Sequence, residues 1–223
     1  MIISHRHRFV FVKTTKTAGT SVEIALSKHC GPDDVITPIH PDDEVIRQEK
    51  GYPGPQNHVT ALPDGRPWAL NNHSPAVRAR RLLGQQVWRD YFTFAFERNP
   101  FDRTVSAYHY MKKNRVAKGI WKDSLTFDAF VRKPGVLDRI HQRGWGLYAI
   151  NDRVIVDHIY RFEDLNGGMA DIYARLGIDE SEPLMQTKVS KREASYREYY
   201  DAATRALVAK AFEKELETFG YAF

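Results

Sequence analysis

Two short apolar runs, each followed directly by a polar loop and a helix start, constrain this chain more than any other feature. Residues 9–12 (Phe-Val-Phe-Val) are β-branched or aromatic and precede the polar loop 13–21, after which apolar residues recur at helical spacing. Residues 91–96 form a second such run, and Asn99 and Pro100 after it are a favourable N-cap and first helical residue. Strands that alternate with helices predict an α/β fold with a central, mostly parallel sheet.

The rest of the chain extends this pattern. We expect a third strand at residues 154–160 and helices near residues 42–49, 75–83, 100–114 and 201–218, with one more helix that follows residues 162–165 and ends near residue 177. Residues 31–72 hold seven of the eleven prolines, which indicates a long surface excursion, and residues 115–150 are a second segment with weak helix boundaries. Because ligands of parallel α/β sheets bind beyond the carboxyl ends of the strands, a site is expected at the loops after residues 12 and 96.

Composition narrows the class of protein. The 33 lysines and arginines exceed the 28 aspartates and glutamates, so the formal net charge is +5, which permits a polyanionic partner without requiring one. Cys30 is the only cysteine, which excludes a disulfide framework and fits either a reducing compartment or a secreted fold that needs no bridges. The N-terminal residues carry no signal-peptide pattern, and no apolar run approaches the roughly 20 residues of a membrane span. We therefore expect a soluble, cytoplasmic protein.

The first loop has the chemistry of an anion site. A loop that joins a buried strand to a helix start directs backbone N–H groups and the positive end of the helix dipole toward one place. The small residues allow close approach, while a lysine and two hydroxyl groups add donors; the loop consists of Lys16, Thr17, Ala18, Gly19, Thr20 and Ser21. The pattern differs from the nucleotide-hydrolase P-loop, because the lysine precedes the glycine. An ordinary strand–helix turn with an exposed lysine is the alternative.

The second loop offers another cation at a helix start. Arg98 follows the second strand, and Ser106 lies about two turns into the next helix, where it shares one face with Arg103 and Tyr110. An arginine and a serine near a helix N-terminus suit a second phosphate group. An arginine that caps the edge of the sheet is the simpler alternative.

Taken together, the two segments resemble the PAPS-dependent sulfotransferases. Residues 16–21 (Lys-Thr-Ala-Gly-Thr-Ser) are similar to that family's loop for the 5′-phosphosulfate, and residues 98–108 are similar to its Arg-Asn-Pro-x-x-Arg-x-x-Ser-x-Tyr segment for the 3′-phosphate. The order, the gap of about 80 residues, and the later segments 161–165, 199–201 and 219–221 fit the branch that includes the carbohydrate sulfotransferases. The resemblance implies a single domain over residues 1–223 with the three-layer architecture of P-loop NTPases.

Two positions depart from the family pattern. Thr15 and Ala18 replace a proline and a glycine of the usual loop, and an alanine still allows a close turn if its φ angle is negative. Glu97 stands where an apolar residue is usual, which suggests that it pairs with Arg98 or with another cation.

The resemblance also implies a role for each candidate residue. PAPS would be the donor and PAP the product; Lys16 would neutralise charge on the leaving phosphate, and the loop N–H groups with Thr20 and Ser21 would hold the 5′-phosphate. Arg98 and Ser106 would hold the 3′-phosphate, and a late basic segment with Lys188 and Arg192 would close over the 3′-phosphate and adenine. We expect His73, which lies just before a helix, to be the general base. A capping or surface histidine is the alternative reading.

The remaining expectations concern partners. The acceptor would carry a hydroxyl group, with a carbohydrate favoured by analogy, and segments 31–72 and 115–150 would shape its pocket. We expect no metal, no nucleic acid and no membrane span, and the oligomeric state is left open. Two other functions compete with this one: a non-catalytic basic module that binds polyanionic glycan or nucleic acid, and a small-molecule kinase of related fold.

Overall fold

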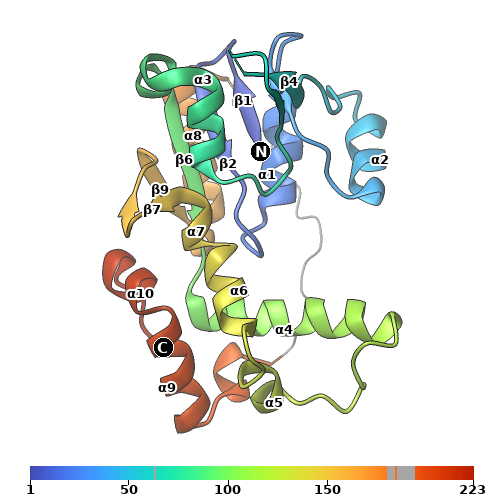
Figure 1. Ribbon diagram of the computed structural model, residues 1–223, viewed down its shortest axis with the longest axis vertical. Helices are drawn as coiled ribbons and strands as arrows, with labels where there is room; N and C mark the ends of the chain where they lie inside the picture. The colour runs from blue at the N-terminus through green and yellow to red at the C-terminus, as the bar shows by residue number, and fades with distance from the viewer. Residues whose placement is uncertain (63, 180–183, 185–193) are drawn as a thin grey trace. The chain divides into compact units, whose positions relative to one another are not determined.

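The computed structural model describes residues 1–62, 64–179, 184 and 194–223 (Figure 1). The chain divides into two compact units. The first comprises Met1–Glu97 and Gly146–Lys188, and the second comprises Arg98–Trp145 and Val189–Phe223. Each unit therefore draws on two separate stretches of the sequence.

The first unit is built on a five-stranded sheet. Its strands are β1 (Ile2–Ser4), β2 (Phe9–Val12), β3 (Val35–Ile36), β6 (Phe92–Glu97) and β9 (His158–Arg161), in the order β3-β1-β2-β6-β9. The inner strand β6 runs parallel to both β2 and β9, whereas β1 runs antiparallel to β2 and β3. The predicted α/β fold is confirmed, with a mixed sheet whose parallel part contains both predicted apolar runs.

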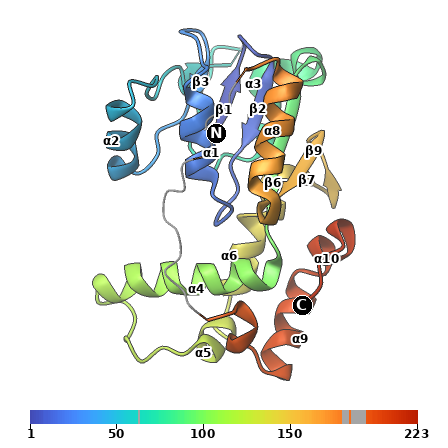
Figure 2. The same cartoon turned by 180° about the vertical axis from the view of Figure 1, so that it is seen from behind.

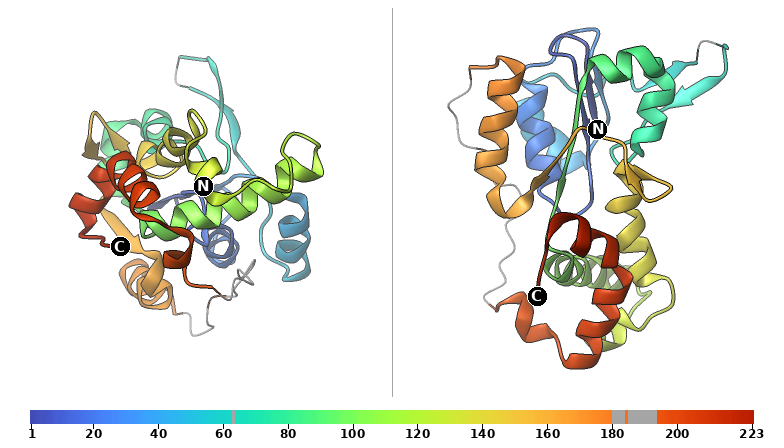
Figure 3. Two further views of the ribbon diagram at one scale, coloured as in Figure 1. Left: turned by 90° about the horizontal axis from the view of Figure 1, so that it is seen from below. Right: turned by 90° about the vertical axis from the view of Figure 1, so that its left-hand side faces the viewer.

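Helices cover both faces of this sheet. α1 (Gly19–Ser27) and α8 (Leu165–Leu176) lie on one face, and α3 (Ala76–Asp90) lies on the other (Figures 2 and 3). The core between the sheet and the helices α1 and α8 contains Phe9, Phe11, Phe94, Phe96, Val22, Leu26, Met169 and Ile172. β2 and β6 are nearly continuous apolar runs because their side chains are buried on both faces.

The smaller elements of the first unit lie outside this sheet. They are α2 (Pro41–Glu49), the 3-10 helix η1 (Phe162–Asp164), the strand pair β4 (Val59–Ala61) and β5 (Pro67–Ala69), and the hairpin β7 (Ala149–Ile150) and β8 (Arg153–Val154). α7 (Trp145–Tyr148) leads the chain from the second unit back into the first. The predicted strand at residues 154–160 is therefore divided between β8 and β9. Asp157, which lies between them, accepts two hydrogen bonds from Thr93 and holds the start of β9 beside β6.

Other elements also differ from the sequence-based predictions. Gly84 leaves the helical conformation (φ 77°, ψ 165°) and divides α3 into two helical stretches, so the first stretch ends where the predicted helix 75–83 ends, and a second, unpredicted stretch continues to Asp90. The predicted C-terminal helix is two helices, because buried Phe212 leaves the helical conformation. β1 and β3 were not predicted, since strands of two or three residues are too short to show a periodic pattern.

The second unit is helical in the part of the chain that the structure describes. Its elements are α4 (Pro100–Ala117), α5 (Phe127–Val131), α6 (Val136–Gln142), the 3-10 helix η2 (Tyr196–Tyr199), α9 (Ala202–Ala211) and α10 (Glu213–Phe219). Their shared core contains Phe101, Val105, Tyr108, Phe127, Phe130, Val208 and Phe212. Asn99 caps α4 as predicted, because its side chain accepts a hydrogen bond from the Phe101 N–H at 3.0 Å. Among all described residues, no helix combines the length and apolar character needed to cross a bilayer.

A buried ionic network ties the two stretches of the second unit together. Arg103 Nη2 donates to Glu215 Oε1 at 3.1 Å, and the two side chains are 1% and 0% exposed. His141 Nδ1 lies 3.0 Å from the same oxygen. The guanidinium packs so closely on Gly144 that a Cβ there would lie 2.0 Å from Nη1. Glu215 therefore neutralises a cation that cannot reach water.

We predict that Glu215→Ala lowers the free energy of unfolding by about 3–5 kcal/mol, because it leaves the buried Arg103 guanidinium without its carboxylate partner. Asp128→Ala is the matched control, since it breaks an exposed pair with Arg132 that contributes at most about 1 kcal/mol. Urea denaturation of both variants provides the measurement. Equal losses in the two variants would contradict a structural role for the buried network.

Candidate functional site

The loop between β2 and α1 turns the chain through left-handed backbone. Lys16 and Ala18 have φ angles of 69° and 56°, a region that residues other than glycine rarely adopt. The proposed condition that Ala18 keeps a negative φ angle is therefore wrong. Ala18 is the N-cap of α1 and its side chain supplies no capping hydrogen bond. The first N–H groups of α1 thus lack a side-chain cap, which is the arrangement that binds anions at helix N-termini.

Gly19 is required where the loop meets α1. A Cβ at this position would lie 2.7 Å from Lys13 Cγ and 3.3 Å from the carbonyl oxygen of Thr14. Any side chain here would push against the preceding strand end. The glycine thus lets the helix start approach the loop closely, and it leaves the N–H groups without a covering side chain.

Two threonines fasten the loop to the neighbouring strand. Thr14 Oγ1 donates to the carbonyl oxygen of Phe96 near the end of β6, and it lies 2.7 Å from Thr17 Oγ1. Thr17, a predicted donor-binding residue, therefore uses its buried hydroxyl within the loop. Thr20 is half-buried and Ser21 is buried at the start of α1. The carboxyl ends of β2 and β6 are tied together at the edge where a ligand was expected.

A buried ion pair lies beneath the loop. Lys13 Nζ donates to Glu23 Oε2 at 2.7 Å, and the α-amino group of Met1 donates to Glu23 Oε1 at 2.6 Å. Burial alone would raise the pKa of Glu23, but these two positive groups hold it below its ordinary value. The sequence analysis did not identify Lys13 or Glu23. The available signal was one carboxylate inside the apolar stretch Val-Glu-Ile-Ala-Leu of α1.

His73 is held against the same loop. Its Nδ1 lies 2.9 Å from the carbonyl oxygen of Lys13, which can only accept a hydrogen bond. Nδ1 therefore carries a proton, so Nε2 is the nitrogen that is basic when the ring is neutral. The loop of residues 71–74, which carries His73, is held in place because Ser74 is fully buried and its Oγ accepts a hydrogen bond from the Asn71 N–H at 2.8 Å. The structure thus brings the predicted base to the predicted anion loop.

The predicted 3′-phosphate residues belong to the second unit. Arg98 is 9% exposed, and its Nε and Nη2 donate to Asp102 Oδ2 at 2.9 and 2.6 Å. Ser106 is half-buried on α4. Arg103 was expected to share the functional face of this helix, but its guanidinium is buried against Glu215. Its role is structural for this reason, and Arg98 is the residue held at the helix start.

Glu97, the residue that departs from the family pattern, is fully buried at the end of β6. Its Oε2 accepts a hydrogen bond from the hydroxyl group of Tyr148 at 2.6 Å, and Tyr148 is also fully buried. A buried carboxylate at this position therefore has a neutral donor beside it, which the sequence analysis did not foresee. The distance of 51 residues between the two positions hides this pair from any local pattern.

Two further predictions concern the late basic segment and metal binding. Lys188 and Arg192 lie outside the described residues. Within the described ranges, no group of three or more His, Cys, Asp or Glu side chains is placed to hold a metal ion.

A helix start whose N-cap residue supplies no side-chain hydrogen bond, with an imidazole held against the loop before it, is an arrangement that can hold an anion and accept a proton. A family model described as the sulfotransferase family matches residues 1–222. The chain belongs to the sulfotransferase family.

Two individual proteins are similar to the chain. A protein of Archaeoglobus fulgidus is 32% identical over 106 residues, which are 48% of this chain and 84% of that protein. The crystal structure of a sulfotransferase from Alicyclobacillus acidocaldarius aligns over 97% of this chain and 96% of that chain, with 16% identity and a TM-score of 0.41.

The left-handed angle of Ala18 yields a stability prediction. Such a conformation costs an L-residue about 1–2 kcal/mol, while glycine adds about 0.4–1 kcal/mol of unfolded-state entropy. We expect Ala18→Gly to leave the free energy of unfolding unchanged or to raise it by up to about 1 kcal/mol. Ala25→Gly inside α1 is the control and should lower it by about 1 kcal/mol. Urea denaturation distinguishes the two, and an equal loss in both would contradict strain at Ala18.

Proposed function

We propose that this protein transfers a sulfuryl group from PAPS to a hydroxyl group of an acceptor, with a carbohydrate as the favoured acceptor class. The observation that carries the proposal is the hydrogen bond from His73 Nδ1 to the Lys13 carbonyl, three residues before Lys16. It holds the imidazole next to the loop that we assign to the 5′ end of the donor. A site for an anionic donor and a proton acceptor for a hydroxyl nucleophile are thus combined in one unit.

The residues of the loop fit the donor. Its 5′ end is a dianionic group, and the start of α1 offers N–H groups without a side-chain cap, a cradle at Gly19 that a Cβ would fill, and the ammonium group of Lys16. When bound, PAPS supplies an activated sulfuryl group whose transfer leaves a phosphate. Lys16 and the N–H groups of α1 would stabilise the negative charge that develops on that phosphate.

We assign Arg98 and Ser106 to the 3′-phosphate, and Lys188 and Arg192 to the same phosphate and the adenine. The double hydrogen bond to Asp102 fixes the guanidinium plane of Arg98, so little rotamer entropy is lost on binding. A 3′-phosphate distinguishes this donor from ATP.

His73 would act as the general base. The acceptor oxygen forms a bond to sulfur, the bond from sulfur to the 5′-phosphate oxygen breaks, and the hydroxyl proton passes to His73 Nε2. The carbonyl of Lys13 keeps the proton of the neutral ring on Nδ1 and so orients Nε2 for this step. In-line geometry and charge stabilisation account for the rest of the catalysis, as in phosphoryl transfer.

A ligand-binding measurement separates this proposal from its alternatives. We expect PAP to raise the Tm, because it carries both phosphates that the site would hold. ATP with Mg²⁺ and heparin are the comparison ligands. A rise with ATP–Mg²⁺ and none with PAP would favour a kinase, and a rise with heparin alone would favour a polyanion-binding module.

We predict different kinetic defects for substitution of His73 and of Lys16. His73→Ala should lower kcat about 10²–10⁴-fold and leave the affinity for PAP unchanged, because the imidazole acts only on the acceptor proton. Lys16→Ala should lower kcat and also weaken PAP binding, since the ammonium group faces the phosphate in both states. Transfer of ³⁵S from PAPS to glycans, lipids and small alcohols gives the rates, and calorimetry gives the affinities. Near-normal turnover in His73→Ala would remove that residue from the mechanism.

A further inference from the structure

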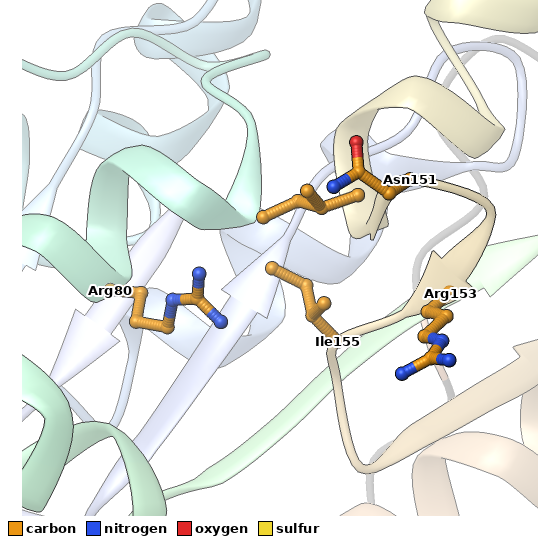
Figure 4. Close-up of a pocket in the computed structure, with 5 residues that line it drawn as sticks. Arg80, Asn151, Arg153 and Ile155 are labelled. Atoms are coloured by element: carbon orange, nitrogen blue, oxygen red, sulfur yellow. The ribbon is translucent and has the colours of Figure 1, made fainter.

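A cleft of about 430 Å³ lies in the first unit. It is lined by Arg80, Ile150, Asn151, Arg153 and Ile155. Arg80 comes from α3, and the other residues come from the β7–β8 hairpin and the chain that follows it. In the view of Figure 4, Ile155 is seen between the two arginines. The size is that of a small-molecule site, for which about 300–1,000 Å³ is usual.

The hairpin that forms one wall has a defined shape. Ile150 pairs with Arg153 across the hairpin, so Asn151 and Asp152 form a two-residue turn. Their φ angles are 47° and 63°, the positive values that tight hairpin turns require, and asparagine tolerates them better than most residues. Asn151 lies in this tight turn, and Arg153 is the first residue of the strand that follows it.

Both arginines of the cleft keep their donors available. Neither the Arg80 nor the Arg153 side chain forms a hydrogen bond or an ion pair with any residue that the structure describes. The arginines near Arg80 on α3, in contrast, contact other residues. Arg78 lies over the Trp68 ring at 4.1 Å from its centroid and donates to the Ala69 carbonyl, and Arg81 lies 5.3 Å from the same ring. Two guanidinium groups in one cleft raise the local positive potential, which an anion would neutralise.

We propose that this cleft binds an oxyanion group, a carboxylate or a sulfate, on the acceptor. Guanidinium groups recognise such groups by paired charge-assisted hydrogen bonds. The Asn151 amide can bond to hydroxyl groups, and Ile150 and Ile155 offer an apolar surface for a ring. The ligand class is therefore a hydroxylated ring that carries an acid, either as a sugar unit or as a small hydroxy acid.

The position of Arg80 connects the cleft to the proposed reaction. The assignment of the bound acid to the acceptor therefore rests on the proposed function. α3 begins at Ala76, three residues after His73, and Arg80 lies four residues further along the helix. An extended chain spans at most about 3.6 Å per residue and a helix rises about 1.5 Å per residue, so the two Cα atoms are within about 17 Å. An acid held in the cleft would place a distant hydroxyl of the same acceptor near the imidazole.

Calorimetry on the full chain saturated with PAP tests the proposal, because PAP prevents acids from binding at the loop. One pair of probes is a glucuronate-containing tetrasaccharide and its carboxyl-reduced form. The other pair is para-hydroxybenzoate and para-hydroxybenzyl alcohol. We expect at least one acid to bind about 10-fold or more tightly than its neutral counterpart, and the pair that shows the difference identifies the carrier of the acid.

Variants locate the binding. Arg80→Ala and Arg153→Ala should each weaken binding of that acid about 10–100-fold, whereas Arg89→Ala, which removes the same charge from α3 outside the cleft, should leave it unchanged. Far-UV circular dichroism confirms that the variants are folded. Equal binding of both acids and their neutral counterparts, or unchanged affinity in both cleft variants, would overturn the proposal. If PAP itself fails to bind, the donor assignment is wrong, and the same titrations on Lys16→Ala without PAP still test the cleft.

Discussion

The change from strand β2 to helix α1 within six residues is the constraint on which the site depends. Two residues with side chains, Lys16 and Ala18, adopt left-handed backbone to make this turn. The conformation is unfavourable by itself, so it persists because the surroundings determine it. The Thr14 hydroxyl fastens the loop to β6, and the absence of a Cβ at Gly19 lets the helix start close against Lys13. The result is a helix N-terminus without a side-chain cap, which suits an anion.

Lys13 has two different partners beside this turn. Its buried side chain forms an ion pair with Glu23, and its carbonyl oxygen accepts a hydrogen bond from the ring of His73. Lys13 thus forms the buried ion pair through its side chain and orients the His73 ring through its backbone carbonyl. The second unit also contains a buried ion pair, because Glu215 neutralises buried Arg103. Asp102 orients Arg98 at the start of α4. In each unit a buried carboxylate thus neutralises one basic residue that lies close in sequence to a residue that we assign to the donor.

Local patterns in the sequence predicted the elements that position the site, and long-range pairs remained hidden. The apolar runs of β2 and β6, the cap at Asn99 and the segment 16–21 are contiguous, so propensity and spacing reveal them. The sign of φ at Ala18 was predicted wrongly, because loop closure by Thr14 and Gly19 outweighs the intrinsic preference of alanine. The partners of Glu97 and Arg103 are 51 and 112 residues away, and only tertiary structure brings them together. The division at 154–160 likewise depends on Asp157 and Thr93, which no local pattern connects.

The central claim is that the helix start after Ala18 holds the 5′-phosphate of the donor and that Arg98 and Ser106 hold the 3′-phosphate. A crystal structure of the complex with PAP tests it most directly. We predict the 5′-phosphate within hydrogen-bond distance of the N–H groups of residues 19–21 and of Lys16 Nζ, with the 3′-phosphate on Arg98 and Ser106. A 5′-phosphate bound away from this loop would contradict the account.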